Sequence, residues 1–288
     1  MNTIKKKALN YISITRLDKP TGWILLFIPC IYGIFAASIH TNQKLNPNII
    51  ILFLIGAILM RSVGCIFNDI IDRKIDAKVE RTKNRPLANK TMAIYEAIAL
   101  LTILLFISFL ILLSFNLLTI YLGISSILLI MLYPFMKRIT YWPQLFLGFT
   151  FNWGVIIGWT AITNSIDIEM ILIYISSVFW TLGYDTVYGY QDINDDKKIG
   201  VKSTSILFEK NSKNIIWSFY GLNFLIMLIS LSLIGLNLIS IFVFLGAILF
   251  ALYLVKKLDI TDKNSCALFF SMNKYVGFLV CTSLLISI

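Results

Sequence analysis

The chain has few charged residues and very little histidine for its length. Asp, Glu, Lys and Arg make up 14% of its 288 residues, whereas a soluble domain has about 25%. Hydrophobic residues make up 58%, so the composition excludes an ordinary soluble enzyme and predicts an integral membrane protein that contacts the lipid bilayer. The net charge of +10 does not indicate nucleic-acid binding, because the basic residues lie in short loops between apolar runs.

Cysteine is also scarce, and its spacing excludes a disulfide scaffold or a zinc site. Cys30, Cys65, Cys266 and Cys281 lie in or beside apolar segments, and they form no CxxC pair. We expect four small buried side chains. The only histidine, His40, ends the first apolar run, where an interfacial polar residue is favoured over a metal ligand.

The apolar runs predict nine membrane-spanning helices, because about 20 largely apolar residues cross a bilayer. The expected ranges are 22–40, 49–67, 93–114, 117–135, 144–163, 168–188, 214–234, 238–255 and 267–288. Asn273 and Lys274 interrupt the ninth run, which must include residues 267–274 to be long enough. The basic N-terminus is expected to form an interfacial helix.

Loop charge predicts the orientation of these helices. Of the 25 Lys and Arg residues, only Lys44 falls in a loop on the side opposite the N-terminus. The positive-inside rule therefore places the N-terminus and the charged loops in the cytoplasm. We expect a multi-pass protein of a bacterial inner membrane, with its active site facing the cytoplasm.

The most informative stretch is Arg61 to Pro86, which follows an apolar run and is crowded with charge. Asn68, Asp72 and Asp76 recur every four residues, which stacks them on one face of a helix, with Arg61 two turns before. The basic residues alongside are Arg73, Lys74, Lys78, Arg81, Lys83 and Arg85. Oxygen ligands and basic flanks favour Mg²⁺ with a polyanion. The alternative is a solvated, mixed-charge loop at the membrane surface.

A second stretch, Tyr184 to Thr204, strengthens the metal interpretation. Tyr188, Asp192 and Asp196 again recur every four residues, and Asp185 lies two turns before Asp192. Two acidic helix faces beside lysines predict one two-metal site for a diphosphate.

The two acidic stretches follow the second and sixth expected spans and occupy the motif loops 68–92 and 189–213. Four spans separate them, so they face the same side. This predicts two parallel four-helix pseudo-repeats plus a ninth helix, with cytoplasmic cap loops, in one domain of residues 1–288.

Two polar residues outside these stretches have alternative interpretations. Arg138 suits a bidentate contact to a carboxylate, but its spacing alone favours an ordinary membrane anchor. Asn152, inside the fifth span, needs a partner on another helix or on a substrate. Gly154 and Gly158 are spaced for close helix packing.

Four ordered motifs carry a resemblance over nearly the whole chain. They are RLDKPTG from Arg16, GCIFNDIIDRKIDAKVERTKNRPLA from Gly64, YPFMKRITYWPQLFLGFTFNWG from Tyr133 and DTVYGYQDINDDKKIGVKSTSILF from Asp185. The chain resembles the UbiA-type intramembrane prenyltransferases, and most closely those that prenylate 4-hydroxybenzoate in ubiquinone synthesis. It departs from the pattern where the family's Ser-Asn-Arg is replaced by Ser271-Met-Asn-Lys.

The resemblance implies a nine-helix fold around a central cavity, Mg²⁺, a polyprenyl diphosphate donor and 4-hydroxybenzoate as acceptor. It assigns the acceptor carboxylate to Arg138. The catalytic metal ligands are expected to be Asp72, Asp76, Asp192 and Asp196, with Asn68 beside them. The expected substrate-binding residues are Arg61, Lys78, Arg138, Asn152, Asp185, Tyr188 and Lys202.

Two alternatives remain open from the sequence. One is a UbiA-type enzyme with another acceptor, such as homogentisate, a naphthoate or haem. The other is a membrane transporter with an acidic site. Transporter sites usually lie near the bilayer centre. Here the carboxylates fall at or beyond the ends of the spans, which disfavours transport.

Overall fold

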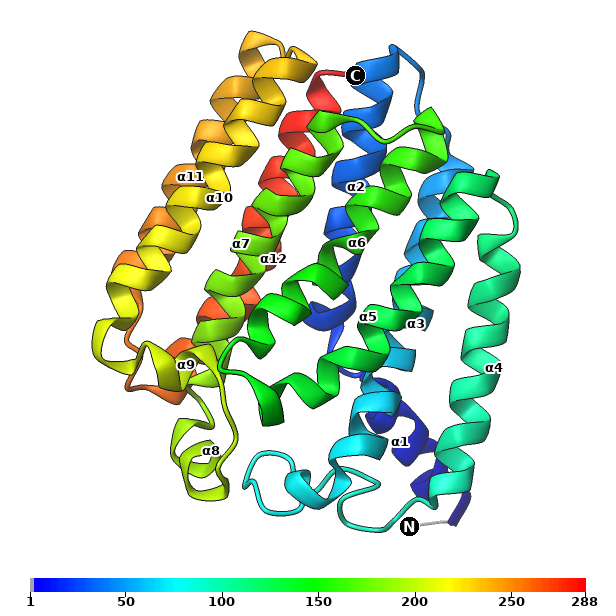
Figure 1. Ribbon diagram of the computed structural model, residues 1–288, viewed down its shortest axis with the longest axis vertical. Helices are drawn as coiled ribbons and strands as arrows, with labels where there is room; N and C mark the ends of the chain where they lie inside the picture. The colour runs from blue at the N-terminus through cyan, green and yellow to red at the C-terminus, as the bar shows by residue number, and fades with distance from the viewer. Residues whose placement is uncertain (1–2) are drawn as a thin grey trace.

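The computed structural model describes residues 3–288, and every regular element within them is a helix (Figure 1). The long helices are α2 (Pro20–Thr41), α3 (Pro47–Asp76), α4 (Ile94–Leu112), α5 (Leu117–Ile139), α6 (Pro143–Thr163), α7 (Ile168–Gly189), α10 (Ser212–Ile234), α11 (Leu238–Lys257) and α12 (Lys263–Ile286). The short elements are α1 (Thr3–Thr15), α8 (Ile193–Ile199), α9 (Thr204–Leu207) and a 3-10 helix, η1 (Glu209–Asn211).

Nine helices in the described part of the chain are long and apolar enough to cross a membrane, as the sequence predicts. The ninth, α12, includes the two polar residues that interrupt its apolar run. Asn273 is tolerated there because its side-chain oxygen accepts hydrogen bonds from Trp180 Nε1 at 2.9 Å and from Tyr220 Oη. The first acidic stretch is helical to Asp76, so that α3 extends well past its apolar part.

The helices run alternately up and down, and this gathers the functional loops at one end (Figure 1). We call this the motif end: it carries α1, α8, α9 and the loops 77–93 and 190–203. The opposite end carries only short connections and the C-terminus. The expected grouping of the two acidic stretches at one end is therefore confirmed.

Helix α2 occupies the middle of the bundle and packs closely against α6. A methyl group added at Gly33 would overlap the carbonyl oxygen of Val155, and one at Gly158 would overlap that of Cys30. The glycines let the two backbones meet, which confirms the prediction for Gly158. All four cysteines are buried and free, also as predicted.

This contact predicts a stability difference between two glycine substitutions. Gly158→Ala forces backbone movement at the α2–α6 contact and should lower the free energy of unfolding by about 1–3 kcal/mol. Gly246→Ala on α11 meets no atom within 4 Å and is the matched control. Thermal unfolding of the purified variants in detergent measures both. Equal midpoints would contradict the close-packing account.

Candidate active site

A cavity of 640 Å³ opens at the motif end and continues into the helix bundle. Its polar part is lined by Asn68, Asp76, Asp192 and Asp196 together with basic side chains. Its apolar part is lined by helices α4 and α5, through residues such as Phe109 and Ile127. The cavity therefore suits a ligand with a charged group at one end and a hydrocarbon chain at the other.

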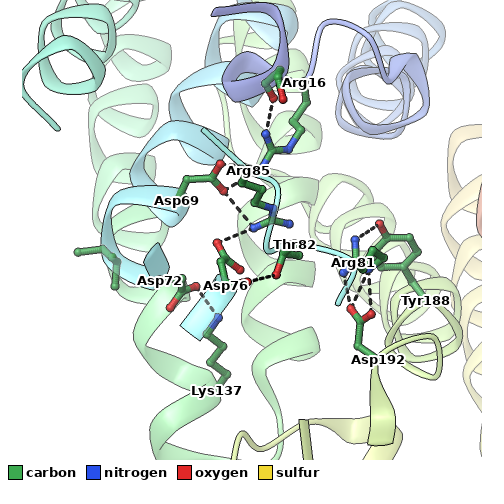
Figure 2. Close-up of polar contacts among 12 residues, drawn as sticks. Arg16, Asp69, Asp72, Asp76, Arg81, Thr82, Arg85, Lys137, Tyr188 and Asp192 are labelled. Carbon is green, nitrogen blue, oxygen red and sulfur yellow. Dashed lines mark hydrogen bonds and ion pairs between the residues drawn. The ribbon is translucent and has the colours of Figure 1, made fainter. Parts of the chain in front are cut away.

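The first acidic stretch is held by two arginines that come from other elements (Figure 2). Arg16, just after α1, pairs with Asp69 at 2.7 Å. Arg85, in the loop after α3, pairs with Asp69 at 3.1 Å and with Asp76 at 2.9 Å. Asp69 is only 2% exposed, and a buried carboxylate requires such partners.

Asp72 is fully buried and faces the end of α5. Its carboxylate forms ion pairs with Lys137 and, at 3.2 Å, with Arg138. Lys137 lines the cavity, whereas Asp72 and Arg138 do not. Two cations from α5 thus neutralise the central carboxylate of the first stretch.

The second acidic stretch does not form the continuous helical face expected from its spacing. Helix α7 ends at Gly189, just after Tyr188. The chain then turns, so that Asp192 becomes the residue preceding α8, and Asp196 lies within α8. Because of this break, the polar segment that follows the apolar span runs across the motif end instead of continuing the helix.

Arg81, which lines the cavity, joins the two stretches through its contacts with Asp192 and Tyr188 (Figure 2). Its Nε donates to both carboxylate oxygens of Asp192, at 3.0 and 2.8 Å, and its Nη1 donates to Tyr188 Oη at 2.8 Å. Its guanidinium also lies 4.9 Å from the centre of the Tyr188 ring. Since Arg81 belongs to the loop after α3, one side chain fixes the distance between the motif loops.

The charges at the motif end alter the proton affinity of the loop residues. Burial, followed by the nearby Asp192, raises the pKa of Asp196 to about 6. Burial alone would lower the pKa of Arg81, but its hydrogen bond to Asp192 and the charges around it raise that pKa overall. Arg81 therefore stays protonated, and Asp196 is ionised above about pH 6.

Comparison with known proteins identifies the family of the chain. The UbiA prenyltransferase family matches residues 26–279. The chain belongs to the UbiA prenyltransferase family.

Among sequence relatives, a protein of Psychromonas ingrahamii named 4-hydroxybenzoate octaprenyltransferase is 41% identical over 282 residues, covering 96% of this chain and 95% of the relative. A protein of Rattus norvegicus named 4-hydroxybenzoate polyprenyltransferase, mitochondrial, is 44% identical over 216 residues, or 74% of this chain. That match spans 57% of the rat protein, so the chain covers little more than half of this relative's length.

Solved structures of UbiA homologues share the fold. One from Aeropyrum pernix superposes with a TM-score of 0.75 at 21% identity, covering 91% of this chain and 97% of the homologue. One from Archaeoglobus fulgidus, bound to GPP and Mg²⁺, has a TM-score of 0.69 at 16% identity, with 95% and 99% covered.

Several of the residues predicted from the sequence line the cavity of this UbiA-family chain. They are Arg61, Asn68, Asp76, Asp185, Tyr188, Asp192, Asp196 and Lys202. Arg61 lies inside, 5.1 Å from the Phe151 ring centre, and its buried Nε has no hydrogen-bond partner among the described residues. Gly22 makes room for it, because a methyl group there would lie 2.8 Å from Nε.

Three predicted substrate-binding residues lie outside the cavity lining: Arg138, which pairs with Asp72, and also Lys78 and Asn152. Lys78 is exposed on the far side of the turn that follows Asp76, because Val79 rather than Lys78 faces inward. Asn152 is buried between α6 and α7, where its amide donates to Gly148 O and to Thr181 Oγ1, both at 2.8 Å. Its partner is thus a neighbouring helix, one of the two alternatives that the sequence leaves open.

The sequence assigns no individual role to five charged residues that organise this site, although two of them, Arg81 and Arg85, belong to the basic flank expected to suit a polyanion. They are Arg16, Asp69, Arg81, Arg85 and Lys137. Arg81 and Arg85 are four residues apart, as are the carboxylates. This shared spacing is the feature of the sequence that could have indicated that the arginines pair with the carboxylates. Within residues 3–288, no three acidic, His or Cys side chains converge as ligands of one ion. Four of the site carboxylates pair instead with an arginine or a lysine: Asp69, Asp72, Asp76 and Asp192.

The buried Asp69 pairs predict a localised loss of stability. Asp69→Asn leaves Arg16 without a counter-charge and leaves Arg85 with only that of Asp76. Breaking such a buried pair costs about 3–5 kcal/mol. Amide hydrogen exchange should therefore accelerate in the loop 77–93. The control is Lys83→Gln, which breaks an exposed ion pair with Glu80 and should cost less than about 1 kcal/mol. Equal exchange in the two variants would contradict this role.

Proposed function

We propose that the protein transfers a polyprenyl group from a polyprenyl diphosphate to 4-hydroxybenzoate, at the ring carbon ortho to the hydroxyl, in ubiquinone biosynthesis. The observation that carries the proposal is the cavity that combines carboxylates and cations at the motif end with an apolar wall beyond them. The names of the relatives support this choice of donor and acceptor.

The donor set of the site fits Mg²⁺, which prefers hard oxygen ligands and retains some of its waters. We propose that Asp72 and Asp76, with Asn68, hold one ion, and that Asp192 and Asp196 hold another. When bound, Mg²⁺ neutralises the charge that develops on the diphosphate leaving group. The structure of the Archaeoglobus fulgidus homologue bound to GPP and Mg²⁺ supports this assignment.

The basic residues of the site are proposed to bind the diphosphate. Arg81, Arg85 and Lys137 now neutralise the carboxylates, and they gain free donors when those carboxylates bind cations. Arg61 and Lys202, which line the same cavity, are further candidates for the diphosphate oxygens. These contacts stabilise the separated leaving group as the allylic C–O bond breaks.

Aromatic side chains line the cavity next to the second stretch. The rings of Tyr188 and Phe270 have centres 4.4 Å apart, and Tyr184 lies 5.6 Å from Phe270. Such faces attract a carbocation and exclude water from it. Asp185 is proposed to orient the acceptor hydroxyl. The ortho ring carbon then forms the new C–C bond and loses its proton, while diphosphate leaves.

The placement of the protein is part of the same proposal. We infer one prenyltransferase domain over residues 1–288, in a bacterial inner membrane, with the motif end in the cytoplasm. The excess of Lys and Arg at the motif end supports this orientation. A prenyltransferase with another aromatic acceptor is the second candidate. A transporter is less well supported, because the carboxylates lie at helix ends and in loops.

The first functional prediction concerns the carboxylates. Asp72→Asn and Asp192→Asn should each abolish product formation, and chelation of Mg²⁺ should stop the wild type reversibly. Asp195→Asn is the matched control, because Asp195 lies between Asp192 and Asp196 in the sequence but is assigned to neither ion. Product is measured by mass spectrometry with purified protein. Normal turnover of either variant at low Mg²⁺ would refute the two-ion assignment.

The second concerns the acceptor carboxylate, which the family motif assigns to Arg138. Arg138→Ala should raise KM for 4-hydroxybenzoate on the order of tenfold to a hundredfold, since a charge-assisted hydrogen bond is worth about 1.5–3 kcal/mol. KM for the diphosphate should change far less. Arg61→Ala is the comparison, because Arg61 lines the cavity and Arg138 does not. An acceptor effect confined to the Arg61 variant would move the assignment to Arg61.

The third concerns orientation in the membrane. A single cysteine at Lys83 should be protected from an impermeant thiol reagent added outside intact cells, whereas one at Lys44 should be labelled. The four native cysteines are buried and give a low background. Labelling at Lys83 but not at Lys44 would reverse the proposed orientation.

A further inference from the structure

A second hollow is lined by residues at the start of α10 and at the end of α11. These two helix ends lie at the motif end, at the edge of the bundle (Figure 1). The hollow has a volume of 570 Å³, and it shares no lining residue with the main cavity. The proposed reaction does not use it. Its character is set by four lysines: Lys210 and Lys213 from η1 and α10, and Lys256 and Lys257 from α11.

The hollow carries a strong positive charge. None of the four lysines forms an ion pair with any residue that the structure describes. The carboxylate in the lining is that of Asp259, which accepts hydrogen bonds from Thr261 N at 2.9 Å and Thr261 Oγ1 at 2.7 Å. These bonds, and to a smaller extent the charge of Lys213, hold the pKa of Asp259 below its usual range. The first turn of α10 also has no capping side chain, so its positive dipole end adds to the field.

Two exposed aromatic residues lie next to the hollow on the two helices that form it. Trp217 lies one turn beyond Lys213 on α10, and Tyr253 lies one turn before Lys257 on α11. Their side chains are 37% and 54% exposed, as expected in the aromatic belt at the bilayer surface. Lys213 and Lys257 lie one helical turn farther toward the motif end, which is the side of an aromatic belt that faces the lipid headgroups.

The surface on the bilayer side of the hollow is apolar. Leu225 on α10 and Phe242 and Leu249 on α11 are exposed, and both helices are apolar enough to span the membrane. A ligand with a phosphate in the hollow can therefore lay acyl chains along these helices. A free phosphate ion would contact only the lysines and would leave the apolar surfaces of α10 and α11 unused.

We propose that this basic hollow binds the phosphate headgroup of an anionic phospholipid. Lys210, Lys213, Lys256 and Lys257 contact the phosphate, and the acyl chains lie along α10 and α11. The proposal is independent of the reaction assigned to the main cavity. General attraction to an anionic membrane would depend only on the total positive charge of the protein. The proposed site instead depends on the positions of these four lysines.

Native mass spectrometry of the full chain in detergent tests the site. The protein is offered equal amounts of dioleoyl phosphatidylglycerol and dioleoyl phosphatidylcholine. Wild type should retain the phosphatidylglycerol preferentially. Lys213→Gln with Lys257→Gln should lower that retention on the order of tenfold or more, without changing phosphatidylcholine retention. Lys213→Arg with Lys257→Arg keeps both charges and should retain the lipid.

The matched control is Lys74→Gln with Lys90→Gln, which removes the same charge from exposed lysines at the motif end but outside the hollow. It should leave phosphatidylglycerol retention unchanged. Equal loss in the two glutamine variants, or no loss in either, would overturn the proposal. Displacement of the lipid by millimolar inorganic phosphate would also overturn it, because the site would then recognise the free ion.

Discussion

The architecture of the motif end depends on pairing the buried carboxylates of α3 with cations from distant elements. A carboxylate removed from water is destabilising unless a cation and hydrogen bonds compensate for it. Asp69 meets this requirement with Arg16 and Arg85, and Asp72 meets it with Lys137 and Arg138. The ion pairs thereby attach the end of α1, the loop 77–93 and the end of α5 to one helix.

The same pairing makes the site responsive to its proposed ligands. Asp72, Asp76 and Asp192 each pair with an arginine or lysine, so divalent cations and a diphosphate would exchange partners with groups that are already in place. Arg81 is central to this exchange, because it contacts Asp192 and Tyr188 from a loop that belongs to the first stretch. Bringing opposite charges together beforehand lowers the cost of assembling a highly charged complex at the edge of a bilayer.

Much of the fold could be predicted from the sequence, because a bilayer imposes a length and composition on each helix. The nine spans and the buried cysteines followed from the apolar runs alone. The grouping of the acidic stretches followed from the even number of spans between them, which places both on the same side. Local spacing was less reliable in the second stretch, where α7 ends at Gly189 and breaks the expected helical face.

Side-chain partners could not be predicted in the same way, because tertiary folding of the loops decides them. Lys78 and Arg81 occupy the same basic segment, yet only Arg81 turns into the cavity. Asn152 has the polarity of a substrate contact, but Thr181 on the neighbouring helix is its partner. Charge matching identifies the residues that need partners, whereas the path of the loops determines which partners they find.

The central claim is that one cavity brings a prenyl diphosphate and 4-hydroxybenzoate together for C–C bond formation. The most direct test is to incubate the purified protein with both substrates and Mg²⁺, and to quantify diphosphate and product together. The account predicts equal amounts of diphosphate and of a product whose fragmentation places the prenyl group on the ring carbon beside the hydroxyl. Diphosphate release without prenylated product, or a prenyl group on oxygen, would contradict it.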